Sequence, residues 1–257
     1  MIYDVLKAYR IFLETKYSFE TARTYTIRLR TLFEGQSRTS DLQILDFENI
    51  LENMRTIKHK NYFSQTKNAL LQYCEFRGIS LPVEIQDSIR ELEQGTYKKY
   101  RSLKTVDYRC VQKQIQHLRN KKLRLCFHVL EATGLRVSEL AGITSSDCLI
   151  SDTAITLYFT AKGGARERAI IEKDAYPALF RNIQEILGSI MPDEKLFYSA
   201  IHLQIKANEM GFACHDLRRA FAKLEYKKSR SKTEVMKKLR HTSLKNTNIY
   251  LRSRVII

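Results

Sequence analysis

Residues Ala154–Glu172 read AITLYFTAKGGARERAIIE and carry the β-type pattern that decides the fold class. AITLYF (Ala154–Phe159) and RAIIE (Arg168–Glu172) are short runs with the composition of strands. Between them, the paired glycines Gly163 and Gly164 favour a tight turn. The stretch therefore predicts a β-hairpin, in a chain whose three prolines and nine glycines otherwise leave long uninterrupted segments.

Helical patterns flank this hairpin on both sides. Helices are expected near Val106–His117 and Lys121–Thr133, then over Ala175–Ile190, around His202–Glu209, and from His215 through Leu239. An α+β domain, dominated by helices with one small sheet, is predicted for this part of the chain.

About the first 80 residues show helical spacing of their apolar positions. Helices are predicted over residues 2–15, Phe19–Phe33, Asp46–Thr56 and about Tyr62–Phe76, the second and fourth of them ending at glycines. A segment of this size needs a single core, so we predict a compact four-helix unit.

The stretch ELEQGTYKKYRSL (Glu91–Leu103) is polar and basic, with a glycine and no apolar periodicity. Such a composition is typical of an interdomain linker. We therefore predict a helical domain at residues 1–90, a linker at 91–104 and the α+β domain at 105–257. The linker cations can touch a phosphate backbone or can simply be solvated, and both interpretations stay open.

The charge balance points to the class of partner. The 257 residues hold 44 Lys and Arg against 28 Asp and Glu, a net charge of +16. This excess favours a polyanionic partner, with nucleic acid as the first candidate. The alternative is a basic, well-solvated protein without such a partner. The basic residues are spread along the chain, which argues against a membrane surface. Candidate DNA contacts are Lys67, Lys98, Lys99 and Arg101.

Other features of the sequence limit the possible cellular compartment and the possible metal ligands. The longest uncharged stretches are too short to cross a bilayer, and the N-terminus lacks the features of a secretory signal, so a cytoplasmic location is expected. Five cysteines at wide spacings, without a C-x-x-C pair, are predicted to be reduced and buried, and not to be metal ligands: Cys74, Cys110, Cys126, Cys148 and Cys214.

A first candidate site residue lies in ATGLRVSELAGI (Ala132–Ile143), where Gly134 ends one helix and Ser138 can cap the next. Arg136 sits in the turn between them, fixed in direction as a bidentate phosphate ligand must be. The alternative, an arginine that caps a helix C-terminus or pairs with Glu139, has equal weight.

Two further candidates come from HDLRRAFA (His215–Ala222) and from the hairpin. His215 and Arg218 are three residues apart, so on a helix they share a face and can approach one ligand atom, although the motif alone is weak evidence. Lys162 lies at the tip of the predicted hairpin, where its ammonium can donate a proton to a leaving oxygen. An ordinary solvated lysine is the alternative at that position.

The last candidates lie in LRHTSLKNTNIYLRS (Leu239–Ser253). On one straight helix, nine residues at about 100° each would put His241 and Tyr250 on opposite faces. The residues between them break and cap helices readily, so one helix is predicted to end near His241 and another to begin around Asn246 or Thr247. Such a break allows both side chains to reach the same phosphate.

Taken together, these stretches resemble the tyrosine recombinase (phage integrase) family, which breaks and rejoins DNA through a tyrosine nucleophile. ATGLRVSEL resembles the family's first arginine box, HDLRRAFA its H-x-L-R box, LRHTSLKNTNIY its L-G-H…Y box and TAKGGARER its G-K-G-x-K-x-R hairpin. The first segment, with its T-x-x-x-Y element (Thr21–Tyr25), is similar to the core-binding domain. The resemblance is to the two-domain members, so no arm-binding domain is expected before this segment.

The chain departs from the family pattern at three positions. Arg240 replaces the usual glycine before His241, Asn246 replaces a usual threonine, and Ala161 replaces the glycine before Lys162. The hairpin is also one residue longer, which leaves the register of Lys162 open.

The resemblance implies a mostly α fold with a small β-sheet, composed of an N-terminal four-helix core-binding domain and an α+β catalytic domain. It implies a site-specific recombinase or integrase that forms a 3′-phosphotyrosine link without a metal or nucleotide cofactor. Tyr250 would attack, two arginines would clamp the phosphate, Lys162 would protonate the 5′ oxygen, and the histidines would serve as acid/base and hydrogen-bond donor; the implied catalytic residues are Arg136, Lys162, His215, Arg218, His241 and Tyr250.

Recombination on two duplexes further implies a homotetramer on double-stranded DNA. The apolar tail Val255, Ile256 and Ile257 is expected to pack against a neighbouring protomer, with packing into its own domain as an equal alternative. Two other functions stay open, a type IB topoisomerase-like enzyme and a recombinase-derived DNA-binding regulator that has lost catalysis.

Overall fold

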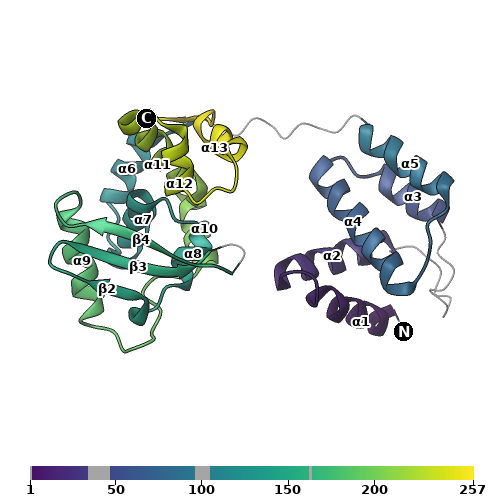
Figure 1. The fold of residues 1–257 in the computed structure, drawn as a ribbon, viewed down its shortest axis with the longest axis horizontal. Helices are drawn as coiled ribbons and strands as arrows, with labels where there is room; N and C mark the ends of the chain where they lie inside the picture. The colour runs from purple at the N-terminus through teal and green to yellow at the C-terminus, as the bar shows by residue number, and fades with distance from the viewer. Residues whose placement is uncertain (1, 34–46, 96–104, 162–163) are drawn as a thin grey trace. The chain divides into compact units, whose positions relative to one another are not determined.

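The computed structural model describes residues 2–33, 47–95, 105–161 and 164–257. It divides into two compact units, Met1–Ser102 and Leu103–Ile257. Helices dominate the described residues, and small sheets occur in the second unit, which confirms the predicted mostly α fold class (Figure 1). No helix in the described ranges is long and apolar enough to span a membrane.

The first unit is helical throughout its described part (Figure 1). Its helices are α1 (Ile2–Glu14), α2 (Phe19–Leu32), α3 (Phe47–Arg55), α4 (Lys60–Arg77) and α5 (Val83–Gln94). Their core contains fully buried aromatic rings: Tyr9 lies edge-on to Tyr73 at 5.5 Å, and its hydroxyl donates to the carbonyl of Ala69 at 2.7 Å. The four predicted helices are present, and α5 follows them.

Helix α5 was not predicted, although the sequence contains its signal. Pro82 stands at its N-cap, where the ring costs no helical hydrogen bond, and Ile85, Ile89 and Leu92 recur at helical spacing and pack on the core. Because α5 continues to Gln94, it occupies the first residues of the predicted linker. The linker cations Lys98, Lys99 and Arg101 lie outside the described residues.

The predicted hairpin is confirmed in the second unit. Strands β3 (Ala154–Thr160) and β4 (Arg166–Glu172) pair antiparallel, and β2 (Cys148–Ile150), which was not predicted, joins β3 on its other side. Alternate residues of β3 are buried, as expected for a strand with one face on the core. Lys162, at the turn, lies outside the described residues.

Helices cover the buried face of this sheet and build the rest of the unit (Figure 1). They are α6 (Tyr108–Gln116), α7 (Lys121–Thr133), α8 (Val137–Gly142), α9 (Pro177–Leu187), α10 (Ala200–Glu209), α11 (Cys214–Ser229), α12 (Lys232–Lys238) and α13 (Leu244–Leu251), with a 3-10 turn at Ser145–Asp147. Helix α11 reaches two apolar clusters: Leu217 belongs to the main core, and Phe221 packs with Val235 and Leu239 in a smaller one.

Two predictions about helix limits are wrong. The expected helix from His215 through Leu239 is two helices, because Arg230 takes a left-handed conformation (φ 56°) and the Ser231 hydroxyl then caps α12. The helix expected from Val106 begins at Tyr108 instead, because Val106–Asp107 form strand β1 and the Asp107 carboxylate caps α6. Propensity inside each window favoured a helix, and the capping side chains set the limits.

The cysteines are free, as predicted, but they are not all buried. Cys74, Cys126 and Cys214 are buried and Cys148 is half-buried, whereas Cys110 is exposed on α6. The expectation of burial was therefore wrong for Cys110, which lies on the outer face of its helix.

The end of helix α7 is a tightly constrained turn. Gly134 has φ 60°, and a Cβ added there would lie 2.4 Å from Cδ1 of Phe221. Replacement by alanine combines left-handed strain with a core clash, so Gly134→Ala is expected to lower the free energy of unfolding by about 3 kcal/mol in urea titrations.

Gly211 provides the matched control for that variant. It has φ 82°, and an added Cβ would meet nothing within 4 Å. Gly211→Ala therefore measures the conformational cost alone, about 1–2 kcal/mol. Equal losses for the two variants would contradict the clash with Phe221.

Candidate active site

The turn between α7 and α8 holds the first arginine. Gly134 caps α7, and Arg136 occupies the N-cap position of α8. The Glu139 carboxylate accepts from the backbone N–H of Arg136 at 2.8 Å and from its Nη1 at 2.6 Å. Both interpretations weighed for Arg136 are compatible with this geometry, because one terminal nitrogen is paired while the other donors of the guanidinium remain.

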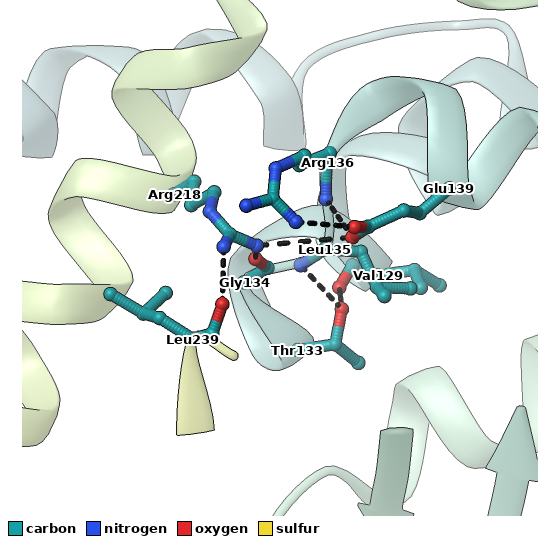
Figure 2. A network of polar contacts seen from close by, with 8 residues as sticks. All are labelled: Val129, Thr133, Gly134, Leu135, Arg136, Glu139, Arg218 and Leu239. Carbon is teal, nitrogen blue, oxygen red and sulfur yellow. Dashed lines mark hydrogen bonds and ion pairs between the residues drawn. The ribbon is translucent and has the colours of Figure 1, made fainter. Parts of the chain in front are cut away.

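The second arginine is buried in the unit. Arg218 on α11 is 0% exposed, and its Nη1 and Nη2 donate to the carbonyls of Gly134 and Leu239. Figure 2 shows both guanidinium groups facing Glu139, with Arg218 Nη1 3.9 Å from its carboxylate. Arg218 thus joins the α7–α8 turn to the end of α12.

The tyrosine ring lies against both histidines. The Tyr250 ring centroid is 5.0 Å from that of His215 and 4.6 Å from that of His241, each edge-on. The Cζ atom of Arg218 lies 5.9 Å from the same centroid. His241 is held in turn by Thr247, whose hydroxyl lies 3.0 Å from the ring Nδ1.

The break between His241 and Tyr250 is present. Helix α12 ends at Lys238 and α13 begins at Leu244, so the interruption starts slightly earlier than expected and includes His241 itself. The predicted start of the second helix at Asn246 or Thr247 is wrong, because Ser243 takes the N-cap position. Tyr250 therefore lies on a separate short helix, which brings its ring to His241, where a straight helix would have placed the two side chains on opposite faces.

The charge of the site is positive and is only partly compensated. Arg136, Arg218 and Arg240 interact electrostatically with the buried carboxylate of Glu139, and Arg240 also interacts with Glu167. Burial, and then the charge of Arg136, lowers the pKa of Arg218 to about 10, so the guanidinium remains charged at neutral pH. An anion is the ligand that this arrangement favours.

Both histidines are neutral at pH 7. The protein packed around His215 lowers its pKa to about 4, although the residue keeps an exposed surface, and Arg219 and Arg218 add to the effect. Burial, and then Arg218 and Arg136, lowers the pKa of His241 to about 4. A neutral imidazole can accept a proton, as a base beside Tyr250 must.

The low pKa of His241 predicts a pH-dependent stability. Because the folded pKa of about 4 lies below the unfolded value of about 6.5, the unfolded chain binds the proton more readily, and stability is lost as the pH falls through this window. Between pH 7.5 and 5, protonation of His241 lowers the free energy of unfolding by about 2 kcal/mol. In urea titrations, the free energy of unfolding of His241→Asn should therefore fall between pH 7.5 and 5 by about 2 kcal/mol less than that of the native chain. Equal losses in the variant and the native chain would contradict the prediction.

The structure brings five of the candidate residues together: Arg136, His215, Arg218, His241 and Tyr250. Lys67 belongs to the first unit, where its Nζ lies 2.7 Å from the Glu93 carboxylate. Among the described residues, no group of three or more acidic, histidine or cysteine side chains is placed to hold a metal ion.

Sequence reasoning missed two residues that support the site. Glu139 was considered as a partner of Arg136 alone, yet it also faces Arg218. Thr247 is 0% exposed and orients His241, a role for which its position six residues later gave no signal. Both roles depend on contacts between separate elements, which helical periodicity does not reveal.

The C-terminal tail packs on its own unit. Val255–Ile256 form strand β5, which pairs in parallel with β1, and Val255 is 2% exposed. The Lys223 ammonium donates to the carbonyls of Ser253 and Val255 at 2.7 and 2.8 Å. Of the two alternatives for the tail, packing into its own domain is the one found in this single chain, while Ile256 remains 59% exposed.

Comparisons with known proteins give one family and a set of similar folds. The chain matches the model of the Phage integrase family over residues 103–255. No curated protein sequence matches it.

Several solved structures share its architecture. A lambda integrase fragment, a dimer bound to a COC′ core site, is 20% identical with a TM-score of 0.68 and covers 97% of this chain and 94% of its own. A lambda integrase tetramer bound to a Holliday junction is 19% identical with a TM-score of 0.71, over 99% and 78%. The XerH recombinase bound to its difH substrate is 18% identical with a TM-score of 0.64, over 89% and 74%. At these identities the likeness shows the fold.

Proposed function

The chain belongs to the phage integrase family, and on that premise we propose that it is a site-specific DNA recombinase that cleaves and rejoins duplex DNA through a 3′-phosphotyrosine intermediate. One observation carries the proposal: the Tyr250 ring lies 5.0 and 4.6 Å from the rings of two neutral histidines and beside a buried arginine. This set supplies a nucleophile, a proton acceptor and a phosphate ligand at one point.

In the proposed cleavage step, the Tyr250 oxygen attacks the scissile phosphorus and loses its proton to His215. The bond from phosphorus to the 5′ oxygen breaks, and that oxygen takes a proton from Lys162. Arg136 and Arg218 neutralise the charge that builds on the non-bridging oxygens. His241 donates a hydrogen bond to the phosphate from Nε2, since its Nδ1 faces Thr247. Rejoining reverses these transfers, so the energy of the broken bond is kept in the phosphotyrosine.

The two units receive different roles in this proposal. We assign the first to core binding and the second to catalysis, with the predicted limits 1–90 and 105–257, and we assign DNA contacts to the part of the predicted linker 91–104 that follows α5. Lys98, Lys99 and Arg101 would then contact phosphates. Lys67 would have to exchange Glu93 for a phosphate, because its ammonium is paired with that carboxylate in the free chain.

We also propose that the chain acts as a tetramer on two duplexes, as strand exchange requires two cuts on each. The tail proposed to join protomers contains one core residue, Val255, so its deletion would damage the fold as well. Ile256→Asp alters an exposed position instead. It is expected to abolish tetramers on DNA, as measured by sedimentation. The Kd for a single DNA site, measured by gel shift, is expected to remain unchanged. Tetramers formed by Ile256→Asp would contradict the role of the tail.

A suicide substrate tests the catalytic proposal. The preferred site is first selected from random duplexes by binding, and then made with a nick that lets the cleaved end diffuse away. The native chain is expected to form a covalent adduct, with the DNA 3′ end mapped by mass spectrometry to the peptide that contains Tyr250. DNA binding without any adduct would instead favour a regulator, and supercoil relaxation without strand exchange would favour a topoisomerase.

A further inference from the structure

Arg240 has a backbone conformation that ordinarily belongs to glycine. Helix α12 ends in a Schellman motif: the His241 N–H donates to the carbonyl of Met236 and the Arg240 N–H to that of Lys237, each at 3.0 Å. The residue at this point must be left-handed, and Arg240 has φ 54°. An arginine here carries strain that a glycine would not.

The side chain adds a second cost. Its Cζ lies 5.0 Å from the centre of the Phe159 ring, a favourable cation–π contact, but its Nε and Nη2 are buried with no hydrogen-bond partner in the described part of the chain. Burial lowers the pKa of Arg240, although Glu139 opposes the shift. Buried cationic donors without acceptors destabilise a fold. Backbone and side chain therefore both leave Arg240 poorly accommodated in the free protein.

The two unpaired nitrogens form one edge of the guanidinium. A phosphate presents two oxygens that match such an edge with two parallel hydrogen bonds. Arg240 is half-buried and lines a cavity of 580 Å³ bounded by α7, β4, α11 and α12, so its side chain has room to change rotamer. The lining of this cavity does not include Arg136, Arg218 or Tyr250, so the unpaired edge has to turn from the cavity toward them to meet a phosphate.

Its neighbours fix where that ligand would be. The residue before it, Leu239, gives its carbonyl to Arg218, and the residue after it, His241, lies against Tyr250. Arg136 and Arg218 both interact electrostatically with the Arg240 charge. A backbone phosphate bound near Tyr250 would therefore lie in the electrostatic field of all three arginines.

We propose that Arg240 is a third phosphate ligand of this chain, binding the non-bridging oxygens of a DNA phosphate at the cleavage site beside Arg136 and Arg218. This rests on the proposed function, and it adds a residue to the site at a position where the family pattern has glycine. Strain in the free chain is then offset when the unpaired edge meets its phosphate.

Arg240→Gly tests the proposal, with Arg230→Gly as its matched control. Arg230 has φ 56° at the end of α11, so both variants relieve left-handed strain and remove one positive charge. Both are expected to unfold at higher urea concentration than the native chain. In binding to a duplex of random sequence, Arg240→Gly should reduce the slope of log K against log salt by about 0.9, as for one lost phosphate contact, and Arg230→Gly should not.

Cleavage provides a second readout. Arg240→Gly is expected to slow adduct formation on the suicide substrate by about 10²-fold, and Arg230→Gly to leave it unchanged. Arg240→Lys keeps the charge without the two-pronged edge, so it should restore the salt slope but not the full rate. A salt slope and adduct rate in Arg240→Gly equal to those of Arg230→Gly would overturn the inference. A native chain that forms no adduct would count against the proposed function alone, because the salt slope does not require cleavage.

Discussion

Tyr250→Phe is expected to bind the selected DNA site with an unchanged Kd and to form no covalent adduct. The substitution removes one oxygen, the proposed nucleophile, and keeps the ring that packs against His215 and His241. The Thr247 hydroxyl does not replace it, since Thr247 is fully buried and is held by His241. The measurement is the adduct yield on the suicide substrate, alongside a gel-shift titration.

Tyr226→Phe is the matched control for this variant. Tyr226 on α11 packs against the same small apolar cluster as Tyr250, so it reports the loss of a tyrosine hydroxyl from that cluster. It is expected to form adduct at the native rate. An adduct formed by Tyr250→Phe would place the nucleophile elsewhere and refute the proposed chemistry.

Arg218→Ala has the second largest expected effect, a decrease of about 10³-fold in the rate of adduct formation. In the proposed reaction, a fully buried guanidinium beside the tyrosine would stabilise the transition-state charge without solvent screening. The same change leaves the carbonyls of Gly134 and Leu239 without their donor, so the free energy of unfolding should also fall by about 2 kcal/mol.

Rates and stability must be separated for this variant. Adducts are measured at a temperature at which circular dichroism shows Arg218→Ala to be folded. Arg181→Ala removes the same charge from an exposed position on α9, and it is expected to leave the rate unchanged. A rate reduced equally by both variants would mean that Arg218 acts through net charge and not as a ligand of the phosphate.

Local patterns predicted the elements that carry their own signals. Helix α7 has the predicted limits because Gly134 ends it, and the hairpin formed because two β-type runs flank paired glycines. Strand β2 is three residues long with two of them exposed, too short for a recognisable alternation. Helix α5 was missed because Pro82 resembles a terminator, whereas at an N-cap it begins a helix.

The site also has features that the sequence could predict and features that it could not. The break before Tyr250 could be predicted, because the residues after His241 compete with a helix for their backbone hydrogen bonds. The sequence could not choose between the two roles of Arg136, since pairing with Glu139 and facing a phosphate use different nitrogens of one group. Nor could it show that Arg218 is fully buried, which depends on the packing of α7, α11 and α12.

The pairing of β5 with β1 has a mechanical consequence for the proposed reaction. Helix α13, which carries Tyr250, is fastened on one side by the Schellman turn and on the other by β5, itself held by Lys223. Once Tyr250 is joined to a broken strand, any pull or torque from the DNA reaches the protein through this helix. Because both of its ends are anchored, that force is shared with the core of the unit, and the cut end remains in place until it is rejoined.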